Sequence, residues 1–226
     1  MTQIKWSFAV ITNLLISIVV VGGSWLMTQS DLQRSAYEVA RIKGDSLFHL
    51  IKTTRSWNSS HGGVHVPVTV GTQPNVYLDT VDRDVTDSLG RKLTKVNPAY
   101  MLRQISDQLE GGDVEIRLAS LQPIHLLNAA DEWEKKMLPL FEDGQRDSIV
   151  SLEGERFRFI APLPLEQSCL SCHQNDMYQL GEVSGGISIS FPAQQIAQLV
   201  DGLVAQSKNR YLLVFSSIFL LGMGMF

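Results

Sequence analysis

The two cysteines of this chain lie three residues apart and are followed directly by a histidine, in the stretch Cys169-Leu170-Ser171-Cys172-His173. Two thiols at this spacing can form thioethers with the two vinyl groups of one porphyrin, which brings the next residue under the iron. The pattern therefore predicts covalent attachment of a c-type haem at Cys169 and Cys172, with the imidazole of His173 as the proximal iron ligand.

Other kinds of site use the same cysteine spacing, and the sequence disfavours each of them. A structural zinc site needs four ligands, but the chain has only these two cysteines and no second Cys/His cluster. A thioredoxin-like dithiol normally follows a strand and opens a helix. This pair instead follows two prolines, Pro162 and Pro164, and the polar run 166–168, which together indicate a loop. A chance pair followed by a histidine is rarer still, so haem attachment is the favoured interpretation.

Haem attachment of this type takes place outside the bacterial inner membrane, and the N-terminus agrees with export. The segment Ser7–Met27 is almost entirely apolar and has the length that spans a hydrocarbon core. It is longer than the apolar region of a cleavable signal peptide and lacks a convincing cleavage site, which favours an uncleaved anchor. Lys5 lies before the segment, and acidic and mixed charges follow it at Asp31, Arg34 and Glu38. We therefore expect residues 1–27 to form a cytoplasmic N-terminus and a transmembrane helix.

A second apolar segment, Tyr211–Phe226, contains no charged residue. It is slightly short for a full span, so it predicts a second transmembrane helix whose far end is missing or barely complete; a buried core helix is the alternative. Residues 28–210 between the two segments are then a periplasmic domain, large enough for a core of its own.

Composition and charge exclude several classes of function. The chain has 19 basic and 23 acidic residues, a net charge of −4, and no basic run. Nucleic acid is therefore not an expected partner. No serine or cysteine nucleophile with a base and an orienting group can be identified, so we do not expect an enzyme.

The pattern of apolar residues predicts an α+β domain. The first helix is expected to continue to about Arg55 and to end at Gly62-Gly63, and the polar residues 72–96 to form a long loop over a pocket. Further helices are predicted over 98–109 and 131–141 and from Pro192 onward. Strands are predicted over 64–70 (at a sheet edge, because of Pro67), 114–118, 148–152, 156–161 and 185–190. Helices crossing one antiparallel sheet predict a PAS-like fold between two transmembrane helices.

Several strings, in this order, resemble one family of periplasmic c-type haem domains with a PAS-like fold. They are Thr53-Thr54-Arg55-Ser56-Trp57-Asn58, His61-Gly62-Gly63-Val64, Lys95-Val96-Asn97-Pro98-Ala99-Tyr100-Met101, Asp131-Glu132-Trp133-Glu134, the haem motif and Gly185-Gly186-Ile187. Such domains are the sensory input of bacterial histidine kinases, diguanylate cyclases and chemotaxis receptors, and also occur as stand-alone cytochromes. The resemblance implies a sensor of redox state or of a diatomic gas. Members usually continue into cytoplasmic output modules, and we identify none within residues 1–226.

The sixth iron ligand must be a soft or imidazole group. The family tends to supply it from the first helix or the turn after it, which makes His49 and His61 the first candidates, followed by Met101. The remaining possibilities are an open or water-occupied site and the side chains of His65, His125, Met137 and Met177. Arg55 and Trp57 are candidates for a cation beside the propionates and an apolar wall; a surface arginine and a core tryptophan are the alternatives.

Two functions of different class follow. In the first, a change at the haem shifts the domain, and the two helices carry the signal across the inner membrane to a cytoplasmic module. In the second, the chain is a membrane-tethered cytochrome that exchanges electrons with a periplasmic partner. The second membrane helix favours the sensor. Sensors of this topology usually work as dimers, so we expect a parallel homodimer with contacts over Thr28–Lys52.

Overall fold

The computed structural model describes residues 2–167 and 179–224. The predicted haem residues Cys169, Cys172 and His173 lie outside the described residues, and so does Met177. The chain divides into two compact units: one comprises Met1–Val39 with Gln194–Phe226, and the other comprises Ala40–Ala193.

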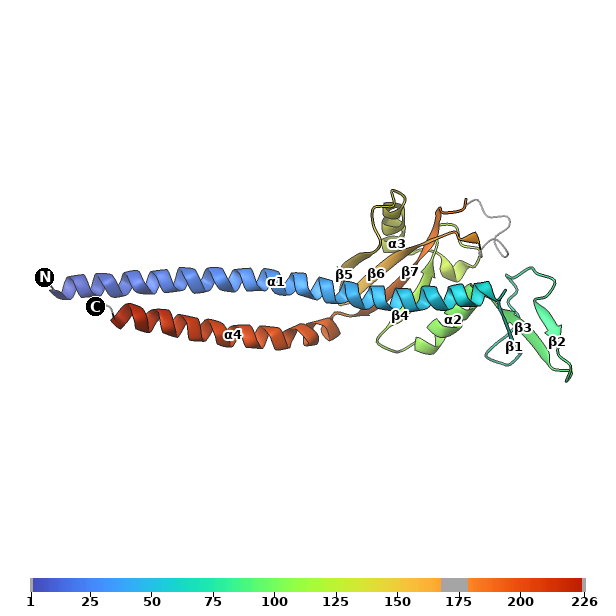
Figure 1. Cartoon of the computed structure of the whole chain (residues 1–226), viewed down its shortest axis with the longest axis horizontal. Coiled ribbons are helices and arrows are strands. Elements are labelled where there is room, and N and C mark those ends of the chain that lie inside the picture. Colours follow the sequence, from blue (N-terminus) through green and yellow to red (C-terminus); the bar gives the residue numbers. More distant parts are fainter. Residues whose placement is uncertain (1, 168–178, 225–226) are drawn as a thin grey trace. The chain divides into compact units, whose positions relative to one another are not determined.

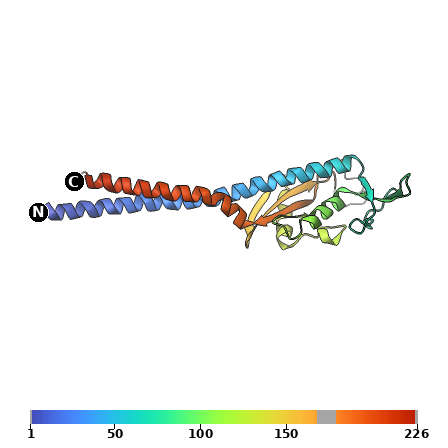
Figure 2. The same cartoon turned by 90° about the horizontal axis from the view of Figure 1, so that it is seen from below.

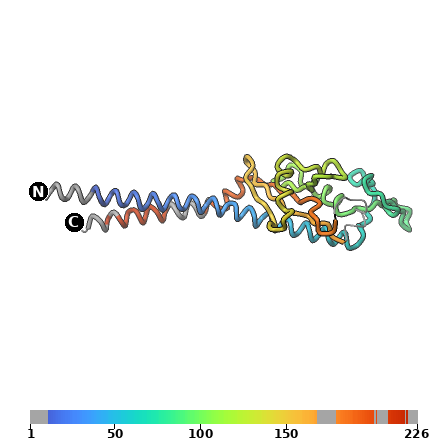
Figure 3. Tube along the Cα trace, turned by 90° about the horizontal axis from the view of Figure 1, so that it is seen from above, coloured from blue at the N-terminus to red at the C-terminus, as the bar shows by residue number. Residues whose placement is uncertain are grey.

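The first unit consists of two helices. The chain begins with helix α1 (Thr2–Ser60) and ends with helix α4 (Ala193–Gly224). Within this unit the two helices run side by side (Figure 3). The hydroxyl of Tyr211 donates a hydrogen bond to the carbonyl of Ser24 at 3.1 Å and also contacts the hydroxyl of Thr28. A polar cluster thus joins α1 to α4 close to the predicted beginning of the second apolar segment.

Among the described residues, one helical segment is long and apolar enough to cross a membrane, namely Ile11–Ser60 of α1. Only 6% of its most apolar window is buried, whereas a core helix of a soluble protein would be mostly buried. By length and composition the segment suits a membrane anchor or a signal sequence, in agreement with the apolar span predicted over 7–27. The predicted second span, 211–226, is helical as far as Gly224, and its crossing of a membrane stays a prediction.

The second unit is built on a four-stranded antiparallel sheet (Figure 1). Its strands are β4 (Glu115–Ala119), β5 (Ile149–Glu153), β6 (Arg156–Pro164) and β7 (Val183–Pro192), in the order β4-β7-β6-β5. Each of these strands lies where the sequence predicts one, although β6 and β7 are several residues longer than expected.

Both faces of this sheet are covered. Successive side chains of a strand point to opposite faces, and Phe159 and Ile160 of β6 are both fully buried. Phe159 faces α1, whose backbone at Gly44 approaches the aromatic ring. Ile160 belongs to a core cluster with Leu138 and Phe141. Figure 2 shows the same arrangement, with the part of α1 that belongs to this unit on one side of the sheet and the shorter helices on the other.

A second, three-stranded sheet corrects the predicted single sheet. It contains β1 (Val64–Pro67), β2 (Asp84–Thr86) and β3 (Lys92–Val96), in the order β1-β3-β2. The predicted loop over 72–96 is therefore wrong for its second half. The prediction missed β2 and β3 because they are polar, and their polar side chains find partners within the fold. The hydroxyl of Thr94 donates to Asp84 at 2.7 Å, and the ammonium of Lys95 binds Asp82.

The first predicted strand is also shorter than expected. It ends at Pro67, and the chain then forms a turn closed by the backbone bonds between Thr69 and Thr72 at 3.0 and 3.2 Å. The strand lies at the edge of its sheet, as Pro67 indicated.

The helices follow their local signals. Helix α2 (Pro98–Leu109) has the predicted bounds, and the side chain of Asn97 caps it by accepting a hydrogen bond from the Tyr100 N–H at 3.0 Å. Helix α1 continues five residues beyond the predicted Arg55, and it ends before Gly62 and Gly63, which have positive φ angles of 71° and 93°.

The predicted helix over 131–141 is divided in two. Helix α3 (Glu132–Met137) is followed by a 3-10 turn, η2 (Leu138–Phe141), because Pro139 has no N–H with which to continue the α-helical ladder. Asp131 caps α3 and accepts a hydrogen bond from Arg158 at 2.7 Å. Burial raises the pKa of Asp131, but the Glu134 N–H and the Arg158 guanidinium outweigh burial and hold the pKa below its usual range.

Candidate functional site

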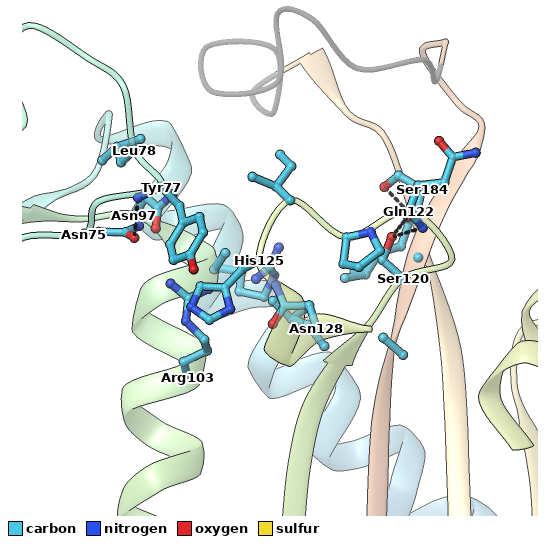
Figure 4. Close-up of a pocket in the computed structure, with 18 of the residues that line it drawn as sticks. Asn75, Tyr77, Leu78, Asn97, Arg103, Ser120, Gln122, His125, Asn128 and Ser184 are labelled. Atoms are coloured by element: carbon cyan, nitrogen blue, oxygen red, sulfur yellow. Dashed lines mark hydrogen bonds between the residues drawn. The ribbon is translucent and has the colours of Figure 1, made fainter. Parts of the chain in front are cut away.

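The second unit contains a cavity of about 750 Å³, shown in Figure 4. Its walls come from Arg55 of α1, the loop 75–81, the first turns of α2, the end of β4, the loop 120–128 and the facing ends of β6 and β7. The loop 75–81 lies within the polar segment that was expected to cover a pocket. Cavities of this size are typical of sites for small ligands and cofactors (about 300–1,000 Å³).

The chain on both sides of the haem motif belongs to the wall of this cavity. Leu163 near the end of β6 and Ser184 near the start of β7 both line it, and the Ser184 hydroxyl donates to the Leu163 carbonyl at 3.2 Å. Nearer to the motif, the N–H of Leu165 donates to the carbonyl of Glu182 at 2.9 Å. The described residues that flank 168–178 are therefore held together beside the cavity.

Gly185 of β7 lines the cavity at the point where β7 lies close to the end of β4. A Cβ atom on Gly185 would lie 2.4 Å from the carbonyl oxygen of Ala119, so no other residue allows β7 to lie this close to the end of β4. The Ser120 hydroxyl donates to the Ser184 carbonyl at 3.2 Å and holds the two strand ends together. Glycine at position 185 therefore allows β7 to pack against the end of β4 where both line the cavity.

Arg55 lines the cavity, and its predicted binding of the haem propionates stays a prediction. One of its guanidinium nitrogens donates to the Pro98 carbonyl at 3.0 Å, which fixes the side chain between α1 and α2. Trp57 does not line the cavity. It is 55% exposed and stacks on His61, with 4.5 Å between the ring centroids.

His49 and Trp57 lie together on the outer surface of α1. They line a shallow depression there with Lys52, Thr53, Ser56 and Ser60. The ammonium of Lys52 lies 3.5 Å from the carboxylate of Glu166, which lies three positions before Cys169 of the haem motif. This depression is therefore a second candidate site for a haem attached to the motif. All of its lining residues come from one helix, α1.

The other predicted distal ligands have protein partners outside the cavity. The Nδ1 atom of His61 lies 2.7 Å from the Trp57 carbonyl oxygen, and the Nε2 atom of His65 lies 2.7 Å from the Asp82 carbonyl oxygen. The sulfur of Met101 lies 3.7 Å from the amide nitrogen of Asn58. Met137 packs against the core cluster. In the described residues, no group of three or more His, Cys, Asp or Glu side chains could hold a metal ion.

Among the predicted distal ligands that the structure describes, His125 is the one that lines the cavity. Its Nδ1 atom accepts a hydrogen bond from the Leu127 N–H at 3.1 Å and so caps the 3-10 turn η1 (Leu126–Asn128). Its ring lies against Tyr77, with 4.2 Å between the centroids. Burial, together with the positive charge of Arg103, lowers the pKa of His125, which keeps the imidazole neutral at pH 7.

Two cavity residues, Tyr77 and Arg103, were not among the predicted site residues. Arg103 lies on α2 one turn after Ala99, and both line the cavity. The predicted helix over 98–109 already put these two positions on one helical face, so the sequence contained a signal for Arg103. It contained none for Tyr77, whose place depends on the path of a loop.

The chain is similar to one protein family and to a solved structure. A model of the Tll0287-like family matches residues 33–192. Among solved structures, the crystal structure of the cyanobacterial haem protein Tll0287 is similar, with 14% sequence identity, a TM-score of 0.47, and coverage of 66% of this chain and 92% of that one. No curated protein matches. Because the family model covers well over half of the 226 residues, the chain belongs to the Tll0287-like family.

Proposed function

We propose that this chain is a membrane-anchored haem c protein of the bacterial inner membrane, with a periplasmic PAS-like domain. Its haem is linked to Cys169 and Cys172, and His173 ligates the iron. The observation that carries the proposal is the position of the cavity, which is lined by the chain on both sides of the motif. Membership of the Tll0287-like family supports it, since Tll0287 itself is described as a cyanobacterial haem protein.

The cavity has the chemistry that a porphyrin requires. Leu78, Ile124 and Leu163 supply apolar surface, and Arg55 supplies a cation for a propionate. Gly185 allows β7 to lie close to the end of β4, and both strand ends line the cavity. The depression beside His49 offers one helix surface only, whereas ligand sites usually enclose most of the ligand. We therefore propose that the haem lies in the cavity and not on the outer face of α1.

The bound haem would supply reversible electron exchange and an iron that binds diatomic gases. The role we propose is sensing of one of these two signals. Arg55 belongs to the helix that contains the apolar span, and β7, which lines the cavity, continues directly into α4. A change in the cavity therefore acts on both helices that leave the domain. A membrane-tethered electron carrier is the competing function, and it needs no such connection.

Covalent attachment is tested by expression with a cytochrome c maturation system. The protein should retain its haem through denaturing gel electrophoresis and stain for peroxidase activity. Cys172→Ser should lose most of the stain, while Ser171→Ala, a change at a position between the two thiols, should keep it. Haem-free wild-type protein from a competent host would overturn the proposal.

Sensing and electron carriage are separated by hydrogen exchange on the haem-loaded protein. A sensor should change the exchange rates of amides in β7 and the first turns of α4 when the haem is reduced or binds carbon monoxide. A simple carrier should exchange electrons with unchanged amide rates, and this result would favour the second function.

A further inference from the structure

One end of the cavity gathers three polar side chains that the haem motif does not explain. Figure 4 shows Tyr77, Arg103 and His125 close together, away from the end where Ser120, Gln122 and Ser184 lie. They come from three separate segments, namely the loop 75–81, helix α2 and the residue before η1. Three segments thus converge on one small region of the cavity wall.

Arg103 brings a positive charge into this region. Its side chain is half-buried, and its guanidinium lies 5.3 Å from the centre of the Tyr100 ring. None of the ion pairs in the described parts of the chain involves Arg103. Burial lowers the pKa of Arg103, and neighbouring groups, among them Asp107, offset this only in part. A half-buried guanidinium without a paired carboxylate is stabilised by an anion in the cavity.

His125 brings a hydrogen-bond donor of fixed direction. Because Nδ1 accepts the Leu127 N–H, the proton of the neutral ring lies on Nε2. The cap on one edge and the contact with Tyr77 on one face hold the ring in place. In this tautomer Nε2 donates and does not ligate iron, since an iron ligand needs a free lone pair there.

We propose that Arg103 and His125, with Tyr77 beside them, form a binding site for a carboxylate group. The guanidinium presents two N–H donors in the geometry that matches the two carboxylate oxygens, and His125 adds a neutral donor. The cavity lining contains two arginines, Arg55 and Arg103, and one acidic residue, Asp79, which is exposed. The charged side chains of the lining therefore favour an anionic ligand. The carboxylate belongs either to a small organic acid or to a propionate of the haem; only the second source rests on the proposed function.

The test measures binding of sodium propionate and sodium succinate by calorimetry. Two forms of the full chain are compared: the haem-loaded protein and the same chain produced without haem maturation. Arg103→Gln should weaken binding about tenfold or more, as expected when a charge-assisted hydrogen bond is lost. His125→Phe, which keeps an aromatic ring beside Tyr77, should weaken it less. Arg146→Gln, a change at an exposed arginine outside the cavity, should have no effect.

The two sources of the carboxylate give different results. Binding to both forms of the protein identifies a free organic acid as the ligand. Binding to the haem-free form alone, with a shift of the haem reduction potential in haem-loaded Arg103→Gln, identifies a haem propionate.

Two results would overturn the proposal. The first is binding that Arg103→Gln leaves unchanged. The second is the absence of binding in both forms together with an unchanged potential in Arg103→Gln; the potential still decides if the haem-free chain does not fold. A wild-type chain that carries no covalent haem would refute the proposed function, and the calorimetry on that same chain would still decide the carboxylate site.

Discussion

Replacing Gly44 by alanine tests how closely α1 lies on the sheet that carries the cavity. A Cβ atom at this position would lie 2.2 Å from Cδ2 and 2.4 Å from Cγ of the Phe159 ring. Carbon atoms in contact prefer a separation of about 3.5–4.0 Å, so the ring or the helix must move by more than about 1 Å. Phe159 is fully buried, which leaves its ring little space to move. Overpacking of this kind costs about 1–3 kcal/mol, and the higher helix propensity of alanine returns up to about 1 kcal/mol.

A contact as short as this one belongs at the upper end of the overpacking range, so the expected net loss is about 2 kcal/mol, which corresponds to a fall in Tm of about 4–8 °C for a chain of this size. The assay is thermal unfolding in detergent, followed by circular dichroism. Gly202→Ala is the matched control, because Gly202 is also helical but a Cβ atom added there would have no neighbouring atom within 4 Å, and it should leave Tm unchanged or raise it. In a Phe159→Ala background the penalty of Gly44→Ala should shrink, because alanine lacks the Cγ and Cδ2 atoms that would lie nearest to the added Cβ. A Gly44→Ala protein at least as stable as wild type would show that α1 does not pack on β6 in this way.

Three further predictions concern acid stability, the iron ligand and assembly. The pKa of Asp131 is lowered in the folded protein, so its contribution to stability is present above the usual aspartate pKa of about 3.8 and is lost as the pH falls below it. Asp131→Asn should therefore flatten the fall of Tm with pH in this acid range, and an unchanged slope would contradict the assignment. With the haem in the cavity, alanine at His49, His61 or Met101 should leave the spin state of the ferric protein unchanged in its visible spectrum. Conversion to high spin by His49→Ala would instead indicate a haem on the outer face of α1. We also expect a parallel homodimer through Thr28–Lys52, and light scattering that shows monomers at micromolar concentration in detergent would count against it.

Local signals made much of the fold predictable. Asn97 and Pro98 set the start of α2, because an asparagine cap followed by a proline suits the first turn of a helix and little else. The hairpin of β5 and β6 follows from two apolar runs separated by Gly154-Glu155. Pro139 could have predicted that the helix expected over 131–141 is divided into α3 and η2. The spacing of apolar residues alone continues through the proline and predicts a single helix.

The β2–β3 hairpin could not be predicted from local sequence signals. Its strands carry few apolar residues, and they are stabilised by contacts such as those of Thr94 with Asp84 and of Lys95 with Asp82. Partners of this kind are a property of the tertiary structure, and a hydropathy pattern does not contain them.

The sequence indicated the types of residue expected around a haem, but it did not indicate which of them face the same cavity. Arg55 and Trp57 were predicted to contact one haem, but two residues on a helix point about 200° apart, so they do not face the same cavity. His49 and Trp57 do share a face, and it is the outer one. The group of Tyr77 and His125 was not predictable, because two loops of irregular path bring them together.

The most direct test of the central claim is the mass of one peptide. Haem-matured protein is digested with trypsin, and the peptides from the region between Arg158 and Lys208, which contains both cysteines, are analysed by mass spectrometry. We predict that the peptide with Cys169 and Cys172 carries one haem through two thioether bonds and that neither thiol reacts with an alkylating reagent. The same peptide found without haem, with both thiols free to alkylate, would contradict the account.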